Sequence, residues 1–173
     1  HGKFRRQRQM CIRDRHTPGF KAVRYGCSQS IEAAINENTA AVLIEPIQGE
    51  GGIIVPPKNY LREVREICTK NNVLMLLDEI QSGLGRTGKL FAYQHSCGDC
   101  NCNIGCEEDQ TKESMPDGLI LGKALGGGFM PVSCFLTSKE VMQWMDPGSH
   151  GSTFGGNPLA AALAKRSLEL LDE

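Results

Sequence analysis

The chain has 173 residues, of which 40% are hydrophobic and 23% are charged, and its formal net charge is -1. This length is enough for one globular domain with a hydrophobic core. The nearly balanced charge gives no indication of nucleic acid or an acidic membrane surface as a partner, and apolar runs such as VLMLL are too short to span a bilayer.

The N-terminal segment differs from the rest of the chain. Its start, HGKFRRQRQM, lacks the apolar core of a secretory signal. The stretch MCIRDR (10–15) resembles the translation of a transposon-end adapter used in DNA library preparation. We therefore expect residues 1–16 to be a non-native or disordered segment. A basic arm and an Arg-rich organelle-targeting segment remain as alternatives.

Residues 17–173 predict alternating helices and strands. SQSIEAAINEN (28–38) is typical of a short helix, and AAVLIEP (40–46) is typical of a buried strand that ends at its proline. The loop IQGEGGIIVPP (47–57) contains too many glycines and prolines for regular structure. NYLREVREICTKNN (59–72) has apolar residues at helical spacing and predicts an amphipathic helix.

The second half contains further strand and helix patterns. The predicted strands are VLMLLDE (73–79), GLILGK (118–123) and VSCFLTS (132–138), and the predicted helices are SKEVMQWMD (138–146) and a last helix that Asn157 caps and Pro158 opens. Unbroken apolar strands separated by helices predict an α/β fold with a mostly parallel sheet and helices on both faces. Such sheets place their chemistry at the carboxyl ends of the strands, where Glu45, Asp78 and Lys123 stand.

The segment LMLLDEIQSGLGRTGKL (74–90) has two features of nucleotide hydrolases. An apolar strand ends in acids, and Gly83 to Lys89 has the spacing of a phosphate-binding loop. However, Leu90 replaces the Ser or Thr that binds magnesium, and FAYQHSCGDCNC is a poor start for a helix. The two motifs also stand side by side in the wrong order, since in such enzymes the loop comes first on a separate strand. We reject this interpretation.

Lys123 and Asp78 suggest another chemistry. Lys123 follows a buried strand in the glycine-rich stretch LGKALGGG (121–128). A desolvated lysine amine can attack an aldehyde, and an acid such as Asp78 can pair with a protonated pyridine nitrogen, as pyridoxal phosphate chemistry requires. The alternatives are a surface lysine in a turn and a carboxylate that caps a helix or fixes a loop.

Four long segments carry a family resemblance. EPIQGEGG (45–52), LLDEIQSGLGRTGK (76–89), PDGLILGKALGGG (116–128) and GSHGSTFGGNPLA (148–160) resemble, in order and spacing, the class III pyridoxal-phosphate-dependent aminotransferases, and among these the ornithine aminotransferases most closely. The resemblance covers residues 17–173. It implies an incomplete large domain of fold type I, the aspartate aminotransferase-like fold.

The resemblance implies roles for individual residues. Lys123 matches the lysine that binds pyridoxal phosphate covalently and then moves the substrate proton. Asp78 matches the acid on the pyridine nitrogen, and Gln81 the amide beside the ring and its phenolic oxygen. Thr153, assisted by Ser152, matches the hydroxyl that binds the cofactor phosphate of a neighbouring subunit, which implies a homodimer with shared active sites.

The resemblance also implies a substrate. Glu50 matches a glutamate that controls which substrate carboxylate binds, with a solvated loop acid as the alternative. Glu45 matches a glutamate that supports the site, and we expect Arg86 and Thr87 to be structural. The implied reaction transfers the δ-amino group of ornithine to 2-oxoglutarate, giving glutamate semialdehyde and glutamate. The alternatives are an acetylornithine or other ω-amino acid aminotransferase, and a racemase or mutase that uses the same cofactor.

The ends of the chain suggest that further parts of the enzyme are missing. The chain starts without Met and stops within the helical pattern LELLDE (168–173). We therefore expect the 173-residue chain, made alone, to lack useful activity. Related enzymes occur in the cytoplasm and in mitochondria, so we expect one of these compartments.

A cysteine-rich insertion at 95–115 departs from the family pattern. It contains His95 and four cysteines, Cys97, Cys100, Cys102 and Cys106. These side chains could in principle hold zinc, but their spacing is too compressed for the two separated pairs of an ordinary structural site. We expect a surface insertion with free thiols, or a wrongly assembled segment, and no metal. Because the cysteines do not form a framework across the chain, we also expect a reducing compartment.

Overall fold

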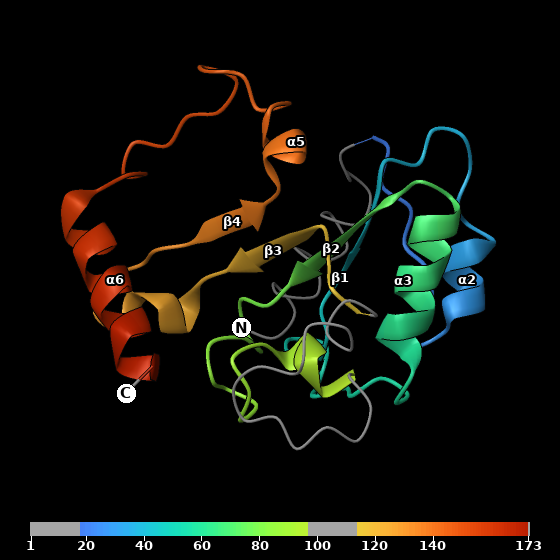
Figure 1. Ribbon diagram of the computed structural model, residues 1–173, viewed down its shortest axis with the longest axis horizontal. Coiled ribbons are helices and arrows are strands. Elements are labelled where there is room, and N and C mark those ends of the chain that lie inside the picture. The colour runs from blue at the N-terminus through green and yellow to red at the C-terminus, as the bar shows by residue number, and fades with distance from the viewer. Residues whose placement is uncertain (1–17, 97–113, 173) are drawn as a thin grey trace, which may run out of the picture.

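The computed structural model describes residues 18–96 and 114–172 (Figure 1). In chain order its elements are helix α2 (Ser28–Glu32), strand β1 (Ala41–Ile44), helix α3 (Tyr60–Lys70), strand β2 (Leu74–Asp78), 3-10 helix η1 (Ala92–Ser96), strand β3 (Gly118–Leu121), 3-10 helix η2 (Lys123–Gly126), strand β4 (Cys134–Thr137), helix α5 (Lys139–Met142) and helix α6 (Pro158–Asp172). Each of the four observed strands lies within one of the segments predicted to be strands, so these predictions are confirmed. The expectations for residues 1–16 and for Cys97 to Cys106 lie outside the described residues.

The four strands form one sheet in the order β1-β2-β3-β4. β1 pairs with β2, and β2 with β3, in parallel, whereas β4 runs antiparallel to β3. The connection from β3 to β4 contains η2 and then turns back at Gly127 and Gly128, whose φ angles of 59° and 79° favour glycine. The mostly parallel α/β fold is confirmed.

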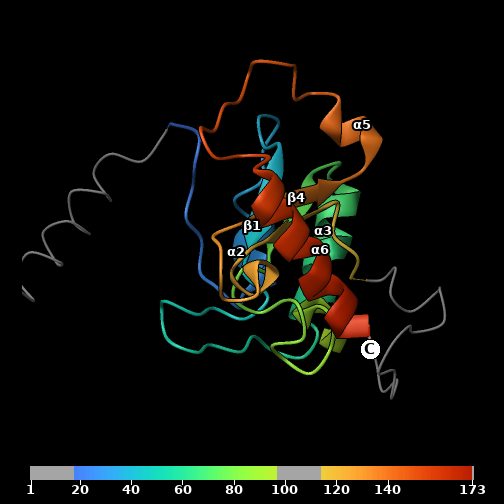
Figure 2. The same ribbon diagram turned by 90° about the vertical axis from the view of Figure 1, so that its left-hand side faces the viewer.

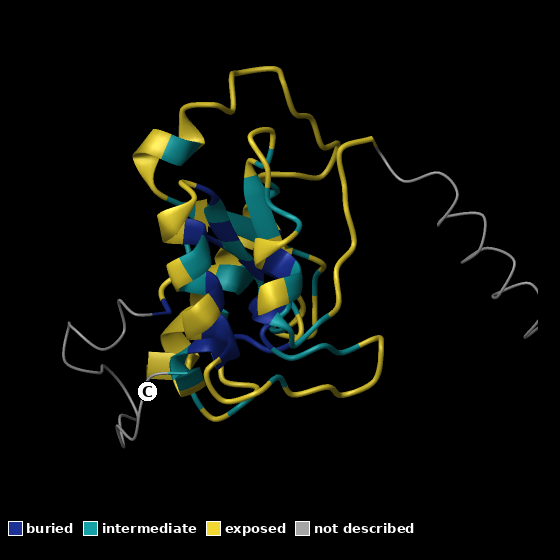
Figure 3. Cartoon of the chain, turned by 90° about the vertical axis from the view of Figure 1, so that its right-hand side faces the viewer, coloured by how far each residue is buried: buried dark blue, intermediate teal, exposed yellow. Residues whose placement is uncertain are grey.

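The larger part of the core lies between the sheet and the α2–α3 pair. Met75 and Leu77 alternate along β2 and are fully buried, as are Val64 and Cys68 on α3. Burial of each such side chain stabilises the fold by about 1.5–3 kcal/mol. Figure 3 shows this buried centre, surrounded by exposed residues. No helix of the described residues is long and apolar enough to cross a membrane.

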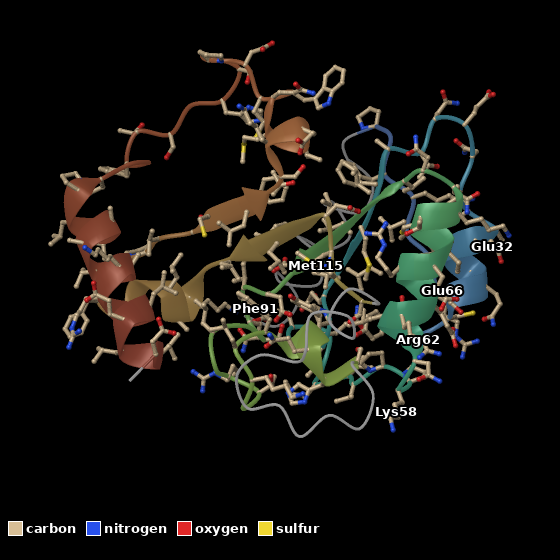
Figure 4. All side chains as sticks on the ribbon, viewed as in Figure 1. Glu32, Lys58, Arg62, Glu66, Phe91 and Met115 are labelled. Atoms are coloured by element: carbon tan, nitrogen blue, oxygen red, sulfur yellow. The ribbon has the colours of Figure 1, made fainter. Side chains whose placement is uncertain are left out.

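A second, smaller cluster lies under α6. Leu84, Leu121 and Leu125 pack together there, with Ala164 of α6 against them. Figure 2, viewed from the α6 side, shows this helix in front of the sheet. Phe91, labelled in Figure 4, packs against both clusters and thereby links them.

Local hydrogen bonds explain where two predicted helices begin or end. Asn157 Oδ1 accepts from the backbone N–H of Leu159 at 2.9 Å, which confirms the predicted start of α6. By contrast, α2 stops at Glu32, earlier than predicted. Asn36 Oδ1 accepts from the Asn38 backbone N–H at 2.9 Å, and this local side-chain bond favours a turn over a further helical turn.

Candidate active site at the carboxyl ends of the strands

Three parallel strands end at the same edge of the sheet. Ile44 of β1 pairs with Leu77 of β2, and Asp78 pairs with Ile120 of β3. Glu45 follows β1, Asp78 ends β2, and Lys123 lies just after β3, so all three stand at the same edge, as expected from the sequence.

Lys123 contacts Gln81 directly. Its Nζ donates a hydrogen bond to Gln81 Oε1, and both side chains are solvent-exposed. Lys123 starts η2 with φ at 44°, in the left-handed region that residues other than glycine rarely adopt. Such a conformation costs on the order of 1–3 kcal/mol, and residues that adopt it cluster at active sites and ligand-binding sites. The structure thus brings together two of the predicted site residues.

Asp78 is fixed by its own turn. Its Oδ1 accepts from the Ile80 backbone N–H at 3.0 Å, and the residue is half-buried. Gly83 then donates to the Glu79 carbonyl at 2.9 Å, which closes a compact turn. A Cβ at Gly83 would lie 2.8 Å from that carbonyl oxygen, so the turn requires glycine there. The turn directs Gln81 outward, towards Lys123.

Glu79 is a buried acid to which the sequence interpretation gave no role. It is 1% exposed, and its carboxylate accepts hydrogen bonds from Ser82 Oγ, the Ala92 N–H and the Tyr93 N–H at 2.7, 3.1 and 3.0 Å. Burial raises the pKa of this carboxyl group, and the three hydrogen bonds oppose the shift. The signal was present in the sequence, because Glu79 continues the alternation of the buried residues Met75 and Leu77.

The loop after β1 approaches the same site. Glu45 Oε2 accepts from the Gly49 backbone N–H at 3.0 Å, and Gln48 pairs with Ile54 across the loop. Glu50 is exposed in the turn between Gly49 and Gly52. A Cβ at Gly49 would lie 3.0 Å from Gln81 Cγ, so this loop lies against Gln81.

Ser152 and Thr153 lie on another part of the surface. Both are exposed, and Ser152 Oγ accepts from the Gly155 N–H within its own loop at 3.0 Å. In Figures 1 and 2 the connection from α5 to α6 runs above β4, whereas η2 lies below it. Within this chain, the loop of Ser152 and Thr153 is thus separate from η2 and Lys123.

The loop that resembled a phosphate-binding motif packs on η1. Lys89 Nζ donates to the Gln94 carbonyl oxygen at 3.1 Å, and His95 Nε2 lies 3.1 Å from both the carbonyl oxygen and Oγ1 of Thr87. The loop leads into a 3-10 helix and not into an α-helix. It therefore connects elements, and Arg86 is exposed on it.

Comparison with known proteins identifies the family. A family model described as aminotransferase class-III matches residues 14–173. The chain is 54% identical over 156 residues to an ornithine aminotransferase from Exiguobacterium sp., which covers 90% of this chain and 35% of that protein. It is 53% identical over 153 residues to ornithine aminotransferase 2 from Staphylococcus saprophyticus, which covers 88% and 35% respectively.

Solved structures agree with this assignment. The ornithine aminotransferase from Toxoplasma gondii superposes with a TM-score of 0.77 at 43% identity, covering 90% of this chain and 34% of that one. Acetylornithine aminotransferase from Elizabethkingia anophelis gives 0.76 at 44% identity, covering 90% and 36%. The chain spans about a third of the length of these relatives. This chain belongs to the class-III aminotransferase family.

Proposed function

We propose that the chain is the central part of a pyridoxal-phosphate-dependent enzyme that transfers the δ-amino group of ornithine to 2-oxoglutarate. The observation that carries the proposal is the contact of the Lys123 amine with the Gln81 amide, next to Asp78 at the carboxyl ends of β2 and β3. The family match and two relatives named ornithine aminotransferase support it.

The side chains present fit the chemistry of this cofactor. Lys123 offers an exposed primary amine for its aldehyde, and Asp78 offers a carboxylate for its pyridine nitrogen, with Oδ1 held by the Ile80 N–H. When bound, pyridoxal phosphate supplies an electron sink for the carbon next to the substrate nitrogen. Lys123 would hold it, and its Nζ would take and return the proton at the reacting carbon.

Gln81 and Asp78 would prepare the site for that proton transfer. Gln81 Oε1 accepts from Lys123 Nζ and so directs the amine. The Asp78 carboxylate would keep a proton on the pyridine nitrogen, because a nearby negative charge favours the protonated base. Both groups come from one turn, so their spacing is set by the four consecutive backbone positions 78–81.

Glu50 is the residue proposed to govern substrate choice. It is exposed on the loop that touches Gln81 through Gly49, so it lies at the rim of the same site. The superpositions do not distinguish ornithine from acetylornithine, since both kinds of enzyme align equally well. The sequence relatives at 53% and 54% identity favour ornithine.

Ser152 and Thr153 are proposed to act in a second subunit. Their loop is exposed and lies apart from η2, the 3-10 helix that starts at Lys123, so their hydroxyls are available to bind the cofactor phosphate of a partner. Large apolar side chains near the loop are also exposed, with Trp144 at 82% and Phe154 at 80%. Exposed aromatic residues are enriched at protein interfaces, which supports a homodimer.

The test uses the full-length protein that contains this chain. We expect purified protein with pyridoxal phosphate to show an absorbance band near the visible edge that borohydride abolishes. Lys123→Ala should lack the band, whereas the control Lys89→Ala should keep it. With 2-oxoglutarate, ornithine should yield glutamate faster than acetylornithine does. A wild-type protein whose spectrum does not change with the cofactor would refute the proposal.

A further inference from the structure

Glu79 joins three parts of the structure next to the proposed site. Its backbone N–H donates to the Ile120 carbonyl at 2.9 Å and extends the pairing of β2 with β3. Its carboxylate binds Ser82 in the following turn, and the first two residues of η1, Ala92 and Tyr93. At 1% exposure, it cannot contact a substrate in solution.

The turn that Glu79 fixes is the one that carries Gln81. Ser82 Oγ donates to Glu79 Oε2 at 2.7 Å, and the Gly83 N–H donates to the Glu79 carbonyl at 2.9 Å. Gln81 lies in the turn between Glu79 and Ser82, and the residue is exposed. The direction of the Gln81 amide therefore depends on a turn whose inner side is held by Glu79.

We propose that Glu79 is a positioning residue that sets the Gln81 amide against the Lys123 amine by tying the turn 79–83 to η1. This inference rests on the proposed function of Lys123 and Gln81. Glu79 acts through Gln81 and touches neither substrate nor cofactor.

The geometry explains why a carboxylate is needed. The Ala92 N–H points to Oε2 and the Tyr93 N–H points to Oε1, so both carboxylate oxygens face backbone donors. In Glu79→Gln one of these oxygens becomes an NH₂ group, which offers only donors. One buried N–H then faces another donor, and the turn must shift or lose that hydrogen bond.

The experiment follows the bound cofactor and not only activity. In the full-length protein with pyridoxal phosphate, we would measure the pH midpoint of the absorbance change of the bound cofactor and the cofactor dissociation constant. If the turn shifts in Glu79→Gln, Gln81 Oε1 no longer accepts a hydrogen bond from the Lys123 nitrogen. This loss disfavours the protonated form of that nitrogen, so the midpoint should fall by about half a pH unit or more. Cofactor affinity should fall about tenfold.

Two comparisons separate positioning from general destabilisation. Glu63→Gln removes the carboxylate that accepts from Ser28 Oγ at 2.5 Å, away from the turn, and should leave the midpoint unchanged. In a Gln81→Leu background, Glu79→Gln should shift the midpoint little further, because interacting residues give non-additive effects. Ser82→Ala, which removes one donor to Glu79, should shift the midpoint in the same direction and serves if Glu79→Gln does not fold.

The outcomes distinguish the two proposals. If the wild-type protein shows no cofactor band, the proposed function is wrong. If the band is present and Glu79→Gln, or Ser82→Ala in its place, leaves the midpoint unchanged, Glu79 does not position Gln81. The inference would also be overturned if the shifts of the midpoint caused by Glu79→Gln and by Gln81→Leu simply add in the double variant.

Discussion

Gly49 lies against the side chain of Gln81, such that a Cβ at position 49 would stand 3.0 Å from Gln81 Cγ. The Glu45 carboxylate holds the Gly49 N–H at 3.0 Å, so the loop cannot easily move away. The loop that carries Glu50 is thereby coupled by direct contact to the amide that touches Lys123.

Gly49→Ala should therefore disturb the site without removing any functional group. Overpacking of this kind costs about 1–3 kcal/mol, and we expect a fall of about fivefold or more in kcat/KM of the full-length protein with ornithine. Gly51→Ala is the matched control, since its Cβ would lie 4.0 Å from Gln48 Oε1, an ordinary contact. Equal kinetics for the two variants would contradict the coupling.

Asp117 anchors the start of β3, and its loss should destabilise the fold. Its Oδ2 lies 2.6 Å from Arg65 Nη1 and accepts from the Met75 N–H at 2.7 Å. The Arg65 side chain is 14% exposed, so its charge is partly buried. We expect Asp117→Asn to lower the free energy of unfolding by about 2 kcal/mol, somewhat less than for a fully buried pair. Denaturant unfolding of the full-length protein measures this.

An exposed ion pair provides the comparison for Asp117. Lys70 Nζ lies 3.1 Å from Glu32 Oε1, and both side chains are largely exposed, at 73% and 48%. Glu32, labelled in Figure 4, lies at the outer side of α2. Glu32→Gln should therefore change stability by less than about 1 kcal/mol. A loss as large as that of Asp117→Asn would contradict this ranking.

The sequence predicted the strands and the strand-end residues because both leave strong local signals. Apolar runs such as those around Leu77 and Leu121 are typical of buried strands, and Asp78 and Lys123 follow them directly. The direction of β4 left no such signal, because a strand at the end of a mostly parallel sheet can pair in either direction and its apolar run does not distinguish the two. The Lys123–Gln81 contact joins positions 42 residues apart and depends on strand register, which composition does not encode.

The different roles of the two adjacent acids could have been predicted in part. Met75 and Leu77 lie on the buried face of β2, and Glu79, which directly follows the strand, continues this alternation. Glu79 therefore points into the core and Asp78 away from it. What the sequence could not provide is the partner of the buried acid. The N–H groups of Ala92 and Tyr93 reach Glu79 only because the loop 84–91 folds back onto the sheet.

The cysteines of the described residues should differ in reactivity. A hydrogen bond from Ser30 and the nearby Arg24 lower the pKa of the Cys27 thiol, whereas burial raises that of Cys68 to about 11. Because the thiolate is the nucleophile, iodoacetamide near neutral pH should label Cys27 well before Cys68. Peptide mapping by mass spectrometry measures both rates in one sample. Equal labelling in the native protein would show that α3 opens readily.

Glu79 should make the stability of the protein depend on pH. Burial raises its pKa in the folded state above the unfolded value of about 4.3, so the folded protein binds a proton that the unfolded chain has already lost. The contribution of this group to stability is therefore fully present below the unfolded pKa and is lost as the pH rises through the folded pKa.

The variant Glu79→Gln provides the reference, because its amide side chain does not titrate. The difference in free energy of unfolding, wild type minus Glu79→Gln, should thus decrease as the pH rises from 4 through this range and then become constant. Urea unfolding of both proteins at a series of pH values measures it, and a difference that increases with pH would show that the hydrogen bonds from Ser82, Ala92 and Tyr93 outweigh the cost of burying the charge.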